Sequence, residues 1–134
     1  MARILDRIVL AATALVLIGV GIAATFTTAA FYGGYGIALT AAPELASELR
    51  ALGAALLLLG IVIGVGAVRE GWVFPSAIVG AAVMLGLALG RIGSAIVDGM
   101  PATSVIAAGV IELVLGGASA WVAVRNRPGS RAGS

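Results

Sequence analysis

The sequence contains no cysteine, no histidine and no lysine, so all eight of its basic residues are arginine. Without cysteine and histidine it has no disulfide, no thiolate or imidazole metal ligand and no Ser-His-Asp triad. Only 10% of the 134 residues are charged, against about a quarter in an ordinary soluble domain. These shortages argue against a water-soluble enzyme, a disordered chain and a nucleic-acid binder. We therefore expect no catalytic residue, no cofactor, no metal and no nucleic-acid partner.

Hydrophobic residues make up 61% of the chain and gather in four runs. Each run has about the 20 residues that a helix needs to cross a bilayer. We therefore expect an all-α membrane protein with four transmembrane helices in an antiparallel bundle. One domain is expected over residues 1–125, followed by a disordered polar tail over residues 126–134. The expected spans cover about residues 8–28, 46–68, 75–97 and 103–124.

The first apolar run has two interpretations. Arg3 and Arg7 precede it and small residues end it, as in a secretory signal peptide. Its apolar core of about 20 residues exceeds the usual 7–15 of such signals, and Asp6 is unusual in their basic start. We expect a retained helix, with a cleaved signal as the alternative.

Residues 31–36 contain three glycines and three aromatic side chains, which predicts a loop at the membrane interface.

The orientation follows from the arginines near the ends of the spans. Six of them fall on one side of the expected bundle, whereas the other side carries only acids. The positive-inside rule then places both termini in the cytoplasm, in a multi-pass protein of the cell inner membrane whose immediate partner is the lipid bilayer. The six are Arg3, Arg7, Arg69, Arg125, Arg127 and Arg131.

Three charged residues cannot be placed in water by this topology: Arg50, Arg91 and Glu112. Helix geometry places the two arginines about 10 Å from the outer end of the bundle and the glutamate about 15 Å deep. Charges in a bilayer cost at least about 2.5–3.5 kcal/mol and usually pair inside a bundle. We therefore expect one buried cluster of these residues with Ser94, a turn after Arg91. Glu48 and Asp98 are expected at its outer edge.

Such a cluster permits two functions of different kinds. A buried ion pair often only locks helices together, so we expect a non-enzymatic structural or accessory subunit with a possible protein partner in the membrane. Two arginines with one carboxylate retain positive charge, so the alternative is a small transporter or a lipid- or anion-binding protein. A membrane enzyme using Glu112 or Asp98 as a general acid or base is a third, less favoured possibility.

Glycine spacing gives one prediction about packing. The second expected span contains Gly60 and Gly64, and the third contains Gly86 and Gly90. Small residues four apart let two helices approach closely in a membrane. We expect these pairs to pack inside the bundle rather than between two copies of the chain.

Four short motifs, in this order and spacing, resemble a family of small four-helix bacterial membrane proteins, domain of unknown function 4345. The resemblance covers about residues 4–125 and implies a membrane location with this topology, but no catalytic role. The segment Leu52-Gly53-Ala54-Ala55 departs mildly from the glycine-rich stretch of similar sequences. The motifs are Tyr35-Gly36-Ile37-Ala38-Leu39, Ser47-Glu48-Leu49-Arg50-Ala51, Leu89-Gly90-Arg91 with Asp98-Gly99 and Pro101, and Glu112-Leu113.

Overall fold

The computed structural model describes residues 2–39 and 43–129. Within these residues the structure is all-helical, as expected, and four helices are long and apolar enough to cross a membrane. Pro43 and Glu44 open one of them, in agreement with the preference for proline and acidic residues in a first turn. The elements are α1 (Ala2–Phe26), α2 (Thr28–Gly33), α3 (Pro43–Val68), η1 (Glu70–Trp72), α4 (Val73–Val97) and α5 (Thr103–Arg125).

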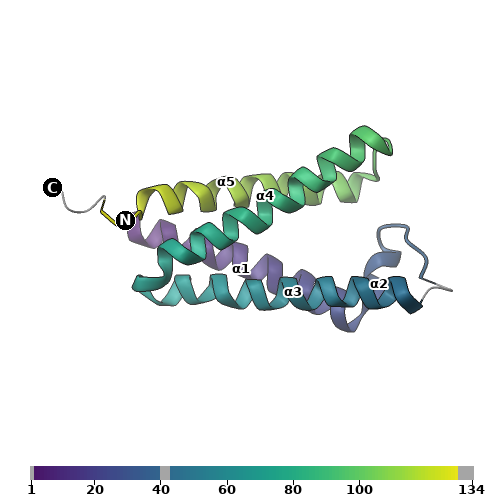
Figure 1. The fold of residues 1–134 in the computed structure, drawn as a ribbon, viewed down its shortest axis with the longest axis horizontal. Coiled ribbons are helices and arrows are strands. Elements are labelled where there is room, and N and C mark those ends of the chain that lie inside the picture. Colours follow the sequence, from purple (N-terminus) through teal and green to yellow (C-terminus); the bar gives the residue numbers. More distant parts are fainter. Residues whose placement is uncertain (1, 40–42, 130–134) are drawn as a thin grey trace.

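The helices form two arms. In Figure 1, α1 lies along α3 and α4 lies along α5, and these are the two most extensive contacts between helices. We call α1, α2 and α3 the first arm, and α4 and α5 the second arm. The start of α1 meets the end of α5, where Asn126 bonds to Asp6. We call this the terminal end, and the opposite end, where α3 begins and α4 turns into α5, the open end.

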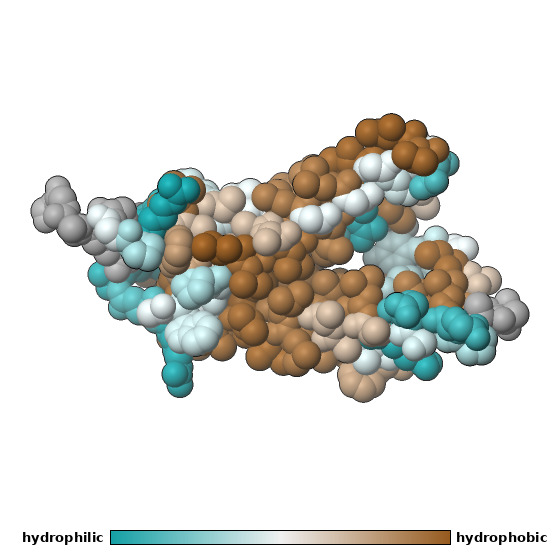
Figure 2. All heavy atoms as spheres, viewed as in Figure 1, coloured by the Kyte–Doolittle hydropathy of each residue, from teal (hydrophilic) through white to brown (hydrophobic). Residues whose placement is uncertain are grey.

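The two arms contact each other along only part of their length. Buried residues of α3 begin at Gly53, those of α4 end at Ala88, and those of α5 begin at Glu112. Beyond these positions the second arm diverges from the first, and Figure 2 shows a notch between them. Among the described residues, α2 contacts neither α4 nor α5. The bundle is therefore forked, with its core in the terminal half.

Glycines bring the backbones of α1 and α3 into contact. A Cβ at Gly21 would lie 2.5 Å from the backbone nitrogen of Leu57, and one at Gly60 would lie 2.9 Å from that of Ile18. The internal packing predicted for Gly60 is thus confirmed. The same prediction is wrong for Gly86 and Gly90, because no described residue beyond their own helix backbone comes within 4 Å of a built Cβ. The reason is rotational, because α4 turns its opposite face to the core.

The first arm bends at Thr27. The hydroxyl of Thr27 donates to the carbonyl of Ala23, and that of Thr28 donates to the carbonyl of Ala24, each at 2.8 Å. Hydroxyls that bond back to the preceding turn compete with the backbone ladder and bend helices. The first helix therefore ends at Phe26. The loop predicted for residues 31–36 is wrong at its start, because α2 continues to Gly33 before a turn that ends at Gly36, whose φ is +79°.

Polar side chains join α1 to α5 at two levels. At the terminal end, Asn126 Nδ2 donates to Asp6 Oδ2 at 3.0 Å. Thr13 lies seven residues after Asp6 and Ser119 seven residues before Asn126, and their hydroxyls are 3.3 Å apart and fully buried. The predicted tail begins at Asn126, yet this residue is half-buried and bonds to Asp6 of α1. Residues 130–134 of that tail lie outside the described residues.

Candidate functional site

The centre of the candidate site is an ion pair at the fork. Arg91 of α4 donates from Nε to Glu112 Oε2 at 2.8 Å and from Nη2 to Oε1 at 2.9 Å. This two-point geometry is the strong form of the arginine–carboxylate interaction. The arginine stem passes Gly109 of α5, where a built Cβ would lie 3.5 Å from Arg91 Cδ, an ordinary van der Waals contact. The structure brings these two of the predicted residues together.

One edge of the Arg91 guanidinium remains unused. A guanidinium carries five N–H donors in a planar fork, and Glu112 takes only those on the Nε side. Within residues 2–39 and 43–129, Nη1 of Arg91 has no hydrogen-bond partner. The side chain is 34% exposed, whereas that of Glu112 is 9% exposed. Arg91 can therefore hold a second anion without releasing the first.

Arg50 does not join this pair. Its Nε donates to the hydroxyl of Thr28 at 3.1 Å, and the residue is exposed. No carboxylate lies within 4 Å of Arg50 in the part of the chain that the structure describes. The expected single cluster is thus divided between the two arms, because the helices diverge where Arg50 stands. Depth along a helix was readable from the sequence, but the divergence was not.

The remaining predicted members lie on the second arm or near the start of α3. Ser94 is exposed and donates to Asp98 Oδ2 at 2.8 Å, one turn along its own helix, rather than to Arg91. Glu48 is exposed on α3, and among the described residues it forms no ion pair with either arginine. Neither Ser94 nor the two acids contribute to the paired centre.

Three aromatic residues gather on α2 and in the turn that follows it. Phe31 stacks edge-on against Tyr32 and Tyr35, with ring centroids 5.1 and 5.3 Å apart. Burial raises the pKa of Tyr32, the Tyr35 hydroxyl raises it further, and Arg91 lowers it, so the guanidinium is within electrostatic range. The sequence placed these rings at the membrane interface but did not assign them to a site. No spacing rule would have shown that Arg91 acts electrostatically on Tyr32.

Sequence reasoning also missed buried polar residues in the terminal half. Asp6, Thr13, Ser76 and Ser119 are all at most 4% exposed. Ser76 Oγ donates to the carbonyl of Val62 at 3.0 Å and joins α4 to α3. Each side chain forms a hydrogen bond with a neighbouring helix or the residue that ends it, which indicates a role in packing. A readable signal existed, since Glu112, Ser119 and Asn126 recur every seven residues on one face of α5.

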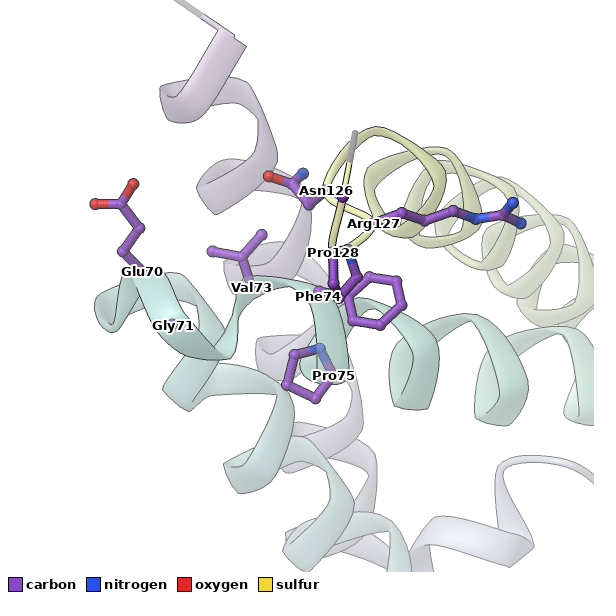
Figure 3. Close-up of a pocket in the computed structure, with 9 residues that line it drawn as sticks. Glu70, Gly71, Val73, Phe74, Pro75, Asn126, Arg127 and Pro128 are labelled. Carbon is purple, nitrogen blue, oxygen red and sulfur yellow. The ribbon is translucent and has the colours of Figure 1, made fainter. Parts of the chain in front are cut away.

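A cavity of about 340 Å³ lies at the terminal end, between the start of α4 and the residues after α5. Figure 3 shows Phe74, Pro75 and Pro128 around it, while the charged ends of Glu70 and Arg127 extend in opposite directions. Polar groups that converge on one point are the usual mark of a ligand site. The cavity lacks this convergence, and none of the predicted site residues lines it.

The four long apolar helices and the charge pair at their fork define an all-helical protein with a polar centre placed where two helical arms separate. The chain belongs to the family described as "Domain of unknown function (DUF4345)", which it matches over residues 5–123. This confirms the resemblance carried by the sequence motifs. No curated protein and no solved structure matches the chain.

Proposed function

We propose that this protein is a non-enzymatic, multi-pass protein of the cell membrane that binds the anionic head group of an amphiphile at its open end. The observation that carries the proposal is the free Nη edge of Arg91, held at the fork by Glu112. A guanidinium fixed on one side by a carboxylate is oriented for two-point binding of another anion on the other side.

The surroundings of Arg91 fit an amphiphile better than a water-soluble ion. Beyond the fork, the second arm exposes large apolar side chains, among them Leu89, Ile96 and Val97 at 65–82%. An acyl chain can lie against such a surface while its head group stays at the guanidinium, a division typical of sites that combine apolar walls with a few polar groups. The arginine count at the span ends supports an outward-facing open end, with both termini cytoplasmic.

The test is a lipid titration followed by native mass spectrometry of the protein in a mild nonionic detergent. Because Arg91→Gln alone would leave Glu112 buried without its partner, the informative variant is the double change Arg91→Gln/Glu112→Gln, which keeps the pair neutral. A hydrogen bond to a charged group is worth about 1.5–3 kcal/mol, so affinity for phosphatidylglycerol should fall about tenfold to a hundredfold. Arg69→Gln, an exposed arginine at the terminal end, is the matched control. Equal affinity of the double variant and the control would contradict the proposal.

One observation favours the accessory-subunit role as a second candidate. Gly86 and Gly90 form a face of α4 that nothing in the described chain covers. Glycine inside a helix is destabilising by roughly 0.5–1 kcal/mol relative to alanine, so an uncovered pair calls for a reason. A neighbouring membrane helix would provide one. Gly86→Leu should abolish recovery of a stoichiometric partner, whereas Gly117→Leu, on the open face of α5, should not. A chain that remains monomeric and unpartnered in a bilayer would remove this candidate.

A further inference from the structure

Helix α4 carries a basic and an acidic side chain on one face near the open end. Arg91 and Asp98 are seven residues apart, so two helical turns bring them to the same side, about 10 Å apart along the axis. Asp98 keeps helical backbone angles, with φ −102° and ψ −11°, and its N–H donates to the carbonyl of Ser94. Ser94 Oγ donates to Asp98 Oδ2 at 2.8 Å, which draws the carboxylate back along the helix toward Arg91. We call Arg91, Ser94 and Asp98 the polar strip.

The two ends of the polar strip favour partners of opposite charge. Arg91 keeps an unused Nη edge, because Glu112 accepts only from its Nε and Nη2. The Asp98 carboxylate forms no ion pair with any residue in 2–39 or 43–129. Asp98 also stands at the carboxyl end of α4, where the helix dipole favours a cation and disfavours an anion. A bound cation would therefore stabilise this carboxylate, while Arg91 holds an anion.

The charges around Arg91 disfavour a head group that is only anionic. Arg91 and Glu112 form a neutral pair, and Asp98 adds one negative charge on the same helix. An anion that binds Arg91 without a cation of its own meets net repulsion, which grows where water is scarce. A ligand that brings its anion to Arg91 and its cation to Asp98 adds no net charge. The polar strip therefore selects a zwitterion.

The order of the two charges matches a phospholipid in a bilayer. Arg91 lies nearer to the middle of α4 and Asp98 lies at its end, in the part of the second arm that diverges from the first (Figure 1). In a phospholipid the phosphate joins the acyl chains, and the amine is the outermost group. Leu87, one turn inward from Arg91 on the same side of α4, is half-buried and apolar. A lipid aligned with α4 thus meets apolar, basic and acidic side chains in the order of its own groups.

We propose that the polar strip binds a zwitterionic phospholipid, with the phosphate at Arg91 and the ammonium at Asp98, and that Ser94 is the positioning residue for the carboxylate. This inference rests on the proposed function and names the ligand class of the same site. It gives Ser94 and Asp98, which do not join the pair of Arg91 and Glu112, a role in selecting the head group.

Native mass spectrometry of the full-length protein in a mild nonionic detergent tests this selection with three ligands. Phosphatidylethanolamine carries both charges, phosphatidylglycerol carries only the phosphate, and glycerophosphoethanolamine carries both charges without acyl chains. Exposed ion pairs are weak, so phosphatidylethanolamine should bind about threefold to fivefold more tightly than phosphatidylglycerol. Glycerophosphoethanolamine should bind far more weakly than either lipid, because it lacks the apolar chains.

Three variants assign the preference to the polar strip. Asp98→Asn keeps the size of the side chain and removes its charge, so it should weaken phosphatidylethanolamine binding about threefold to fivefold and leave phosphatidylglycerol binding no weaker. Ser94→Ala keeps both charges and frees the carboxylate, so it should reduce the preference to less than about twofold. Glu44→Gln removes an exposed acid at the start of α3 and should leave the preference unchanged. Asp98 and Ser94 are exposed, so both variants should fold, which a thermal unfolding curve checks.

The outcomes separate this inference from the function on which it rests. Equal affinity of the unmodified protein for the two lipids, or a preference that survives Asp98→Asn, would overturn the zwitterion site. If Arg91→Gln/Glu112→Gln still weakens both lipids in that case, the proposed function stands. A double variant that binds both lipids as tightly as the unmodified protein would overturn the proposed function and this inference with it. An undiminished preference in Ser94→Ala would overturn the positioning role of Ser94. Glycerophosphoethanolamine that binds as tightly as the lipid would overturn the assignment to a phospholipid.

Discussion

The contact between α1 and α3 gives a sharp test of the first arm. A Cβ at Gly21 would lie 2.5 Å from the nitrogen of Leu57, 2.7 Å from its Cα and 2.8 Å from the carbonyl oxygen of Gly53. Carbon atoms in ordinary contact are about 3.5–4.0 Å apart, so Gly21→Ala must separate the two backbones by about 1 Å. All three obstacles are backbone atoms, which cannot rotate away.

The expected cost follows from this overlap. Overpacking costs about 1–3 kcal/mol, and the upper part of this range applies where only the backbone can move. Gly19→Ala is the matched control on the same helix, since in residues 2–39 and 43–129 nothing outside the backbone of α1 lies within 4 Å of a built Cβ at Gly19. That substitution should stabilise the helix by about 0.5–1 kcal/mol, because alanine is the better helix former. The two variants should therefore differ by about 3 kcal/mol in free energy of unfolding.

Reversible unfolding by sodium dodecyl sulfate in mixed micelles, followed by the fluorescence of the two tryptophans, measures this difference. Equal stability of the two variants would refute the close approach of α1 and α3. A loss confined to Gly21→Ala would show that the first arm is held by backbone contact.

Two further predictions concern the open end. In a Tyr35→Phe background, Tyr32 should titrate above the ordinary tyrosine pKa by ultraviolet absorbance. Arg91→Gln/Glu112→Gln should raise that pKa further, because the Arg91 guanidinium lowers it. Since the folded-state pKa is raised, the free energy of unfolding should be unaffected by this group below about pH 10 and should fall as the pH rises through the folded pKa. An unchanged pKa in the double variant would place the Arg91 guanidinium away from α2. Glu112→Gln should lower the free energy of unfolding by about 1–2 kcal/mol. This is less than for a fully buried pair, because Arg91 is one-third exposed. The exposed control Glu48→Gln should change the free energy of unfolding by no more than about 0.5 kcal/mol.

The sequence was informative about position along each helix. Apolar run length identified the four long helices, and counting residues from their ends placed Arg91 and Glu112 at compatible depths. Those two residues also lie on helices joined by a short turn, which keeps them close. The pairing was therefore predictable from one-dimensional information.

The relations between the arms were not predictable in this way. Counting from the helix ends places Arg50 and Arg91 at the same depth. The two arms diverge at that depth, however, and Arg50 bonds to Thr28 of its own arm. The outward rotation of Gly86 was equally hidden, because a small-residue pair fits a neighbour inside the chain as well as one outside it. Sequence spacing specifies a helix face but not its partner.

The hydroxyl contact between Thr13 and Ser119 also has a mechanical meaning. It lies between the tied terminal end and the fork, and Thr103, at the tip of the second arm, is about 24 Å from Ser119 along α5 at 1.5 Å per residue. A rotation of about 5° around that contact would move the tip by about 2 Å. A small repacking of the terminal half around this contact would therefore change the distance between the two arms at the open end.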